Sequence, residues 1–106
     1  MTEFTDIPQN LEILAEECAE VIRIKSKAIR FGIDDYHPKN GMSNRDALSE
    51  ECGHVIAMIR VLVNNGVLDP EKVEAGAQQK LIGLRDWYLF DPSQARPPIS
   101  SPDSEE

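Results

Sequence analysis

The chain of 106 residues has few cationic side chains, no long apolar run and only two cysteines. Lysine and arginine number 11 against 19 aspartates and glutamates, so the formal net charge is −8. Binding to duplex nucleic acid needs a basic face that neutralises phosphates, and we therefore expect no such partner. A phosphorylated ligand would need a bound cation between it and the protein, because carboxylates and phosphates repel each other.

The sequence contains neither a candidate membrane span nor the pattern of a signal peptide. No segment approaches the roughly 18 apolar residues of a membrane span, and residues 1–10 lack the order of basic then apolar residues that marks a signal peptide. We therefore expect a cytoplasmic protein without a membrane partner. In that compartment Cys18 and Cys52 are expected to stay reduced, as small residues that line the core.

Apolar residues recur at spacings of three and four, which is the helical period, and no strand pattern or internal repeat is present. The first such segment predicts a long amphipathic helix over 7–31. Thr5 or Asp6 can cap its start, Pro8 suits its first turn, and Gly32 suits the left-handed residue that closes a helix. Residues 32–42 contain two glycines, a proline and an asparagine, which predicts a loop.

Two further helices follow this loop. Ser43 with Asp46 resembles a capping box and starts a second helix that runs to about Asn65. Asp69 as cap and Pro70 at the first helical position start a third helix, which extends to residue 90. The segment 91–106 holds four prolines and little apolar mass, so it predicts a disordered, acidic tail rich in proline and serine.

Two of these helices each carry a pair of ligand-type side chains three positions apart. Glu17 and Glu20 lie in the first helix, and Glu51 and His54 lie in the second. Residues three apart share a helix face, and a helical wheel directs Glu17 and Glu51 toward the packing side. In an antiparallel hairpin the two pairs differ in height by about 6 Å, at about 1.5 Å per residue, and the loop can absorb this difference.

Acids that face one another in a core are costly unless their pKa values rise or a cation binds between them. The pairs therefore predict a divalent metal site. Carboxylate oxygens suit Mg²⁺ or Mn²⁺, and an imidazole shifts the preference toward Mn²⁺ or a later transition metal. The alternative is that the glutamates are solvated, as they usually are on helices, and that His54 is a hydrogen-bonded boundary residue.

The motif EECAE at residues 16–20, followed by EECGH at residues 50–54, resembles the EExxE and ExxD signature of MazG-like nucleoside triphosphate pyrophosphohydrolases. The similarity covers about residues 11–88, and segments 14–35 and 49–62 resemble short, single-domain members often carried by phages. The resemblance implies a bound Mg²⁺ or Mn²⁺ and attack of water on the α-phosphorus of a nucleoside triphosphate, which yields a monophosphate and pyrophosphate. The implied metal ligands are Glu17, Glu20, Glu51 and His54.

His54 departs from the family pattern, because it stands where the family has an aspartate. The loss of one negative charge weakens Mg²⁺ binding and either shifts the preferred ion or lowers activity. Two alternatives therefore stay open. In a dimer, one Glu helix and one Glu-x-x-His helix per subunit match a di-iron carboxylate bundle. The chain can also be a nucleotide-binding module of the same fold without turnover.

The resemblance also implies groups that act on water and substrate. Glu16 and Glu50 each adjoin a ligand and are candidates to orient or deprotonate the attacking water. Glu16 and Glu50 can equally be solvated residues. Cationic and aromatic side chains are expected to hold the phosphates and the base, while a solvated surface role for the cations and a core or interface role for the aromatics stay open. The predicted substrate-binding residues are Lys27, Arg30, Lys80, Arg85, Trp87 and Tyr88. Further aromatic or loop residues that can meet the nucleoside are Phe31, Tyr36 and His37.

The predicted fold is all-α, with an antiparallel hairpin of two long helices plus a third helix. The resemblance implies that residues 1–90 form a MazG-like helical domain. A hairpin and one shorter helix cannot cover a face this apolar, so we expect a homodimer or homotetramer with a core like a four-helix bundle. The MazG-like resemblance implies the same assembly, with the substrate near the subunit boundary.

Overall fold

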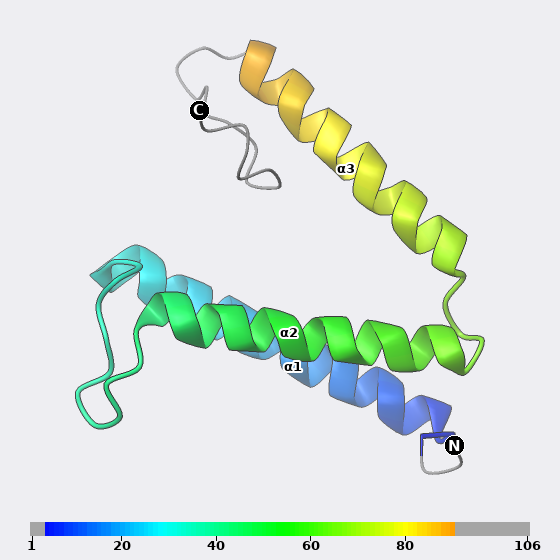
Figure 1. Ribbon diagram of the computed structural model, residues 1–106, viewed down its shortest axis with the longest axis horizontal. Coiled ribbons are helices and arrows are strands. Elements are labelled where there is room, and N and C mark those ends of the chain that lie inside the picture. Colours follow the sequence, from blue (N-terminus) through cyan, green and yellow to red (C-terminus); the bar gives the residue numbers. More distant parts are fainter. Residues whose placement is uncertain (1–3, 91–106) are drawn as a thin grey trace. The chain divides into compact units, whose positions relative to one another are not determined.

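The computed structural model describes residues 4–90 and contains three helices (Figure 1). Helix α1 spans Ile7–Phe31, α2 spans Asn44–Asn64 and α3 spans Pro70–Phe90. Within the described residues there is no strand beyond an isolated antiparallel bridge between Tyr36 and Ser43. The predicted all-α class and the three predicted helices are confirmed, and the predicted tail over 91–106 lies outside the described residues.

Helix α1 begins and ends where the sequence predicts. The Asp6 carboxylate accepts a hydrogen bond of 3.1 Å from the amide of Gln9, so Asp6 is the N-cap. At the other end Gly32 has a φ of +106°, which side chains disfavour, and its amide donates to the carbonyl of Ala28 at 2.9 Å. The chain can therefore leave the helix abruptly and turn toward α2.

The starts of the other two helices use the predicted caps. Oγ of Ser43 accepts a hydrogen bond from the amide of Asp46 at 3.0 Å, which satisfies one of the free amides at the start of α2. Oδ1 of Asp69 accepts from the amide of Glu71 at 2.9 Å at the start of α3. Local capping chemistry therefore marks the start of all three helices and the end of α1.

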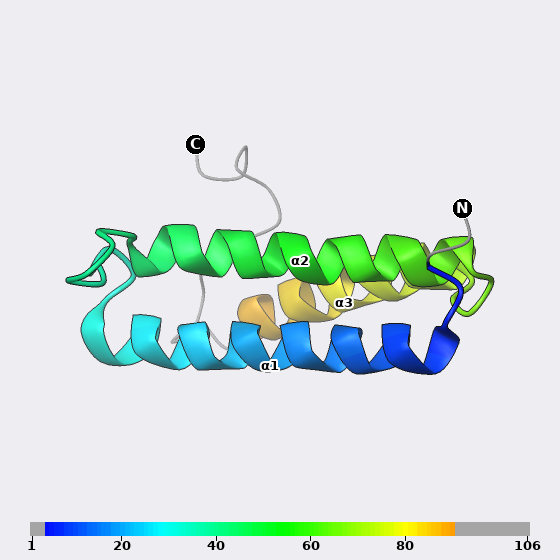
Figure 2. The same ribbon diagram turned by 90° about the horizontal axis from the view of Figure 1, so that it is seen from below.

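Helices α1 and α2 pack against each other as an antiparallel hairpin (Figure 2). The line along which they touch, which we call the seam, contains Ile24, 5% exposed, and Leu62, fully buried. Two buried asparagines lie toward its ends: Nδ2 of Asn10 donates to Oδ1 of Asn65, and Nδ2 of Asn44 donates to the carbonyl of Gly32. These bonds fix the register of the two helices.

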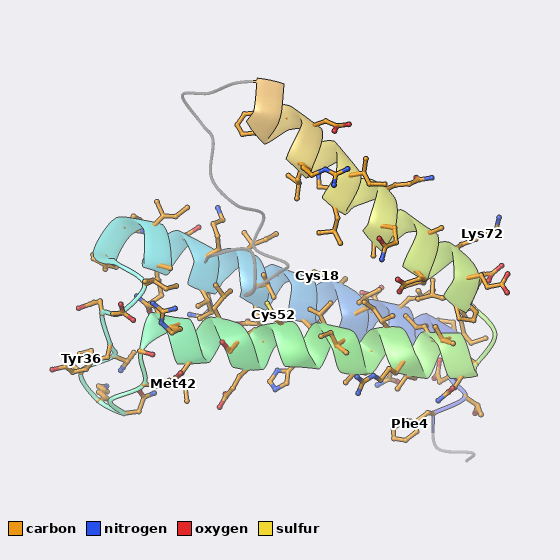
Figure 3. The ribbon with its side chains drawn as sticks, turned by 45° about the horizontal axis from the view of Figure 1, so that its top comes forward. Phe4, Cys18, Tyr36, Met42, Cys52 and Lys72 are labelled. Atoms are coloured by element: carbon orange, nitrogen blue, oxygen red, sulfur yellow. The ribbon has the colours of Figure 1, made fainter. Side chains whose placement is uncertain are left out.

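One side of the hairpin carries an apolar groove of about 380 Å³. Its lining residues are Cys18, Val21, Ile22, Cys52, Val55 and Ile56. Both thiols are free and exposed on this side (Figure 3), so the prediction that the cysteines line the core is wrong for the described chain. The reason is helical phase. Cys18 follows Glu17 and Cys52 follows Glu51, and both glutamates point into the seam. Because consecutive residues of a helix are turned by about 100°, each cysteine points away from the seam.

Helix α3 belongs to a second unit that starts at Asp69. It exposes the large apolar side chains of Val73, Ile82 and Trp87, whereas Leu81 and Leu84 are half-buried. None of the described helices is long and apolar enough to cross a membrane.

Replacing Leu62 by alanine tests the seam as the source of stability. Leu62 is fully buried, so Leu62→Ala should lower the free energy of unfolding by about 2–5 kcal/mol, measured by urea denaturation. The matched change Ile29→Ala, at a side chain that is 74% exposed, should cost much less. Equal losses in the two variants would contradict the assignment of the seam as the core.

Candidate metal centre

Three of the four predicted metal ligands meet in the seam between α1 and α2. Glu17, Glu51 and His54 each offer one ligand atom, and these atoms lie within 4.8 Å of one another. Nδ1 of His54 lies 3.1 Å from Oε1 of Glu51 and 3.3 Å from Oε1 of Glu17. One residue from α1 and two from α2 therefore form a compact group, which we call the Glu-Glu-His cluster.

Helical phase explains why these side chains converge. Glu17 and Ile24 are seven residues apart, which is nearly two helical turns, so they lie on the same face of α1. Glu51 and Leu62 are eleven residues apart, which is about three turns, so they lie on the same face of α2. Both carboxylates consequently point into the seam, where the side chains of Glu17 and Glu51 are only 26% and 20% exposed. His54 is one turn beyond Glu51 and lies at the rim, 54% exposed.

The cluster changes the acid–base behaviour of its histidine. The hydrogen bond to Glu51 raises the pKa of His54 above its ordinary value of 6.5, and the charges of Glu51 and Glu17 add to the effect, while partial desolvation opposes it. A protonated ring offsets part of the negative charge of the two carboxylates. A metal ion competes with this proton, because an imidazole must be neutral to coordinate.

Glu20, the fourth predicted ligand, stands outside the Glu-Glu-His cluster. Its Oε1 accepts hydrogen bonds from Nε and Nη2 of Arg23 at 2.9 and 2.8 Å. Three residues correspond to about 300° of rotation, so Glu20 is turned about 60° from Glu17 toward the rim. The ligand role of Glu20 stays a prediction, and in this structure its carboxylate orients Arg23.

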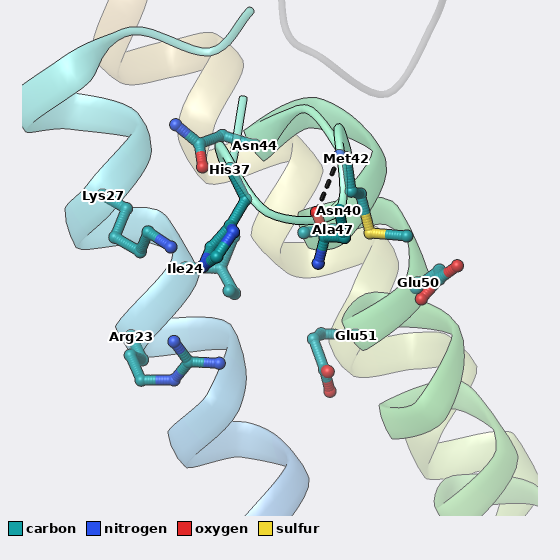
Figure 4. A pocket seen from close by; sticks show the side chains of 10 residues that line it. All are labelled: Arg23, Ile24, Lys27, His37, Asn40, Met42, Asn44, Ala47, Glu50 and Glu51. Carbon is teal, nitrogen blue, oxygen red and sulfur yellow. Dashed lines mark hydrogen bonds between the residues drawn. The ribbon is translucent and has the colours of Figure 1, made fainter. Parts of the chain in front are cut away.

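A pocket of about 340 Å³ opens beside Glu51 (Figure 4). Helix α1 lines it with Arg23 and Lys27, and the connection between α1 and α2 lines it with His37. The facing wall on α2 carries Glu50 and Glu51. The site therefore has a cationic wall and an anionic wall.

Glu50 and Glu16, the residues predicted to act on water, occupy different surroundings. Both are exposed, but Glu50 lines the pocket beside Glu51, whereas Glu16 is not among the residues that line it. Arg23 was missed as a site residue by the analysis of the sequence. The available signal was its position three residues after Glu20 and four before Lys27, which places three charged side chains on one rim of α1.

The other predicted substrate-binding residues are spread over both units. Lys27 is half-buried in the pocket wall, and the guanidinium of Arg30 lies 5.0 Å from the centre of the Phe31 ring. Lys80, Arg85 and Trp87 are exposed on α3, in the second unit, so their roles stay predictions. The side chain of Tyr88 lies outside the described part of the chain.

No protein-family model, curated protein or solved structure matches this chain. The indications of function therefore come from the geometry of the Glu-Glu-His cluster and its pocket, and from the motifs at residues 16–20 and 50–54.

The raised pKa of His54 predicts a pH dependence of stability in the metal-free protein. Because folding raises this pKa, the stabilisation is complete below about pH 6.5, the unfolded value, and is lost as the pH rises through the folded value. Urea denaturation from about pH 5.5 to about pH 8.5 should show this decline, and His54→Gln should flatten it. A decline of the same size in His54→Gln would assign it to another group.

Proposed function

We propose that the chain binds a divalent metal ion, Mn²⁺ or Mg²⁺, through Glu17, Glu51 and His54 and hydrolyses nucleoside triphosphates to monophosphates and pyrophosphate. The observation that carries the proposal is the approach of three ligand atoms within 4.8 Å, next to a pocket with two cationic side chains. The order of acidic residues at 16–20 and 50–54, which resembles the MazG-like signature, supports the choice of reaction.

The donor set suits a metal ion of this kind. Two carboxylate oxygens and one imidazole nitrogen are acceptable to Mn²⁺, and the nitrogen makes Mn²⁺ a better match than Mg²⁺. The two carboxylates are partly withdrawn from water, which makes their mutual repulsion stronger than on an open surface. Glu17, Glu51 and His54 would hold a divalent ion, which would offset this repulsion and polarise water and phosphate oxygens at the site.

The chain's own residues have separable roles in this reaction. When bound, a divalent ion acts as a Lewis acid on phosphoryl oxygen and on water. Glu50 lines the pocket next to Glu51, and we assign it, rather than Glu16, as the base that accepts the proton of the attacking water. Arg23 and Lys27 offset the negative charge of the phosphates and of the departing pyrophosphate.

A metal panel tests the proposal directly. Pyrophosphate release from nucleoside triphosphates should require Mn²⁺ or Mg²⁺, and Glu17→Gln and Glu51→Gln should each lower Mn²⁺ affinity by about tenfold or more in a calorimetric titration. Glu12→Gln removes an exposed charge from α1 outside the Glu-Glu-His cluster and serves as the matched control. Wild-type Mn²⁺ affinity in both cluster variants would contradict the metal site.

The same panel separates the competing functions. Visible absorbance after aerobic loading with Fe²⁺, with no pyrophosphate release, would favour a di-iron carboxylate bundle. Thermal stabilisation by nucleotide without product would favour a binding module. His54→Asp distinguishes a decayed enzyme from a working one: a gain of Mg²⁺-dependent hydrolysis indicates decay, and a loss of activity indicates that the imidazole belongs to the metal site.

We also propose that the chain assembles as a homodimer or homotetramer through the groove lined by Cys18, Ile22 and Ile56. Among the described residues the buried apolar side chains are Ile24 and Leu62, which is a small core for two long helices. Ile22 and Ile56 are 62% and 48% exposed beside it, and a second hairpin packed on this side would form a four-helix bundle.

Sedimentation velocity tests the assembly. The wild-type chain should sediment as a dimer or tetramer, and Ile56→Glu should shift it toward the monomer, because a charge in an apolar interface is costly. Ala57→Glu places the same charge on α2 outside the groove and should leave the oligomer intact. A monomeric wild-type chain would contradict the proposal.

A further inference from the structure

We infer that the pocket beside the metal centre is one half of a longer groove, in which a nucleotide places its polyphosphate between Arg23, Lys27 and Glu51 and its base against Tyr36. The inference rests on the proposed function and specifies how the substrate of that site is held. It assigns roles to Arg23, His37 and Tyr36 that the motifs do not define.

The two pockets that make up the proposed groove adjoin each other along a shared wall. The first pocket, of about 340 Å³, and a second, of about 180 Å³, are both lined by Lys27, His37 and Asn44. The second pocket continues away from Glu51 to Phe31 and Tyr36. We place a single ligand across both pockets, from the Glu-Glu-His cluster to these aromatic rings.

The charge pattern of the first pocket fits a polyphosphate that carries a metal ion. Arg23 is held in place by its two hydrogen bonds to Glu20 and keeps further N–H groups for a ligand. Lys27 is half-buried and forms no ion pair with the described residues. Without a cation on the opposite wall, Glu50 and Glu51 repel phosphates, so polyphosphate binding should depend on the metal.

The wall shared by the two pockets is ordered and offers a hydrogen-bond donor. Nδ1 of His37 accepts a hydrogen bond from the amide of Lys39 at 3.1 Å, so in the neutral ring the proton is on Nε2. The amide of His37 donates to the carbonyl of Met42, and Asn44 is 5% exposed and bonded to Gly32. His37 is therefore held in position to donate to a ligand oxygen where the two pockets meet.

Of the two aromatic rings, Tyr36 is the better one for stacking. The Tyr36 side chain is 62% exposed at the second pocket. Phe31 is also exposed, but the guanidinium of Arg30 covers one face of its ring at 5.0 Å. A base stacked on an open aromatic face gains affinity with little dependence on its identity.

Three probes test the inference on the full chain: Mn²⁺ alone, inorganic tripolyphosphate with Mn²⁺, and α,β-imido nucleoside triphosphates with Mn²⁺. Arg23→Gln and Lys27→Gln should lower affinity for tripolyphosphate and nucleotide by about tenfold or more and leave Mn²⁺ affinity unchanged. Tyr36→Ala should lower nucleotide affinity by about fivefold or more and leave tripolyphosphate binding unchanged. Lys25→Gln, outside both pockets, and Tyr36→Phe, which keeps the ring, are the matched controls.

The outcomes separate this inference from the proposed function. Absence of Mn²⁺ binding would overturn the proposed function and the groove with it. Normal Mn²⁺ binding with wild-type tripolyphosphate affinity in Arg23→Gln and Lys27→Gln would overturn the proposed nucleotide groove and leave the metal site untouched. A Tyr36→Ala variant that binds nucleotide like the wild type would overturn the place of the base. Glu20→Gln should lower the affinity for tripolyphosphate and leave the affinity for Mn²⁺ unchanged. A loss of Mn²⁺ affinity instead would overturn the role of Glu20 in positioning Arg23.

Discussion

Two carboxylates in the seam of a helical hairpin are the constraint on which the rest of this structure depends. Glu17 and Glu51 occupy stripes that otherwise bury Ile24 and Leu62, so the packing that stabilises the hairpin also forces the two acids together. Charges withdrawn from water require a partner, and His54 is the partner that the chain itself supplies. The proton of His54 offsets part of the negative charge of the two carboxylates, and under the proposed function a metal ion would take the place of this proton.

The hairpin separates its chemistry by side. Because neighbouring residues on a helix are turned by about 100°, Cys18 and Cys52 fall on the apolar side, immediately after the acids of the seam. The opposite rim carries Glu20, Arg23 and Glu50. In two antiparallel helices, residues at the same rotation from the seam lie on the same side of the pair. The two motifs therefore place apolar side chains on one side of the seam and charged side chains on the other.

Much of this arrangement can be predicted from the sequence, because helical period and capping act locally. The bounds of α1, the caps Asp6, Ser43 and Asp69, and the inward direction of Glu17 and Glu51 all follow from spacing and residue type. The pairing of Glu20 with Arg23 was not predicted, because its spacing of three from Glu17 suggested a metal ligand. Glu20 is in fact turned about 60° from Glu17 toward the rim of α1, where it pairs with Arg23.

The pocket itself depends on long-range contacts, which periodicity does not encode. Asn44, at the start of α2, donates to the carbonyl of Gly32 and so ties together the two ends of the connecting segment, and His37 of this segment lines the pocket with Arg23 and Lys27 of α1. The position of the cysteines was also not predictable from residue type. Their apolar character suggested burial, yet the packing of α1 on α2 leaves Cys18 and Cys52 at the surface.

The anchoring of the segment 32–43 has an evolutionary consequence. Its ends are held by the hydrogen bond between Gly32 and Asn44, and from the tip at residues 36–41 the side chains of Tyr36, His37, Pro38 and Asn40 line the two pockets. A binding site whose specificity loop is ordered before the ligand arrives loses less configurational entropy on binding. Under the proposed function, substitutions in this tip would alter ligand choice without changing the Glu-Glu-His cluster, so that selectivity and reactivity could change separately.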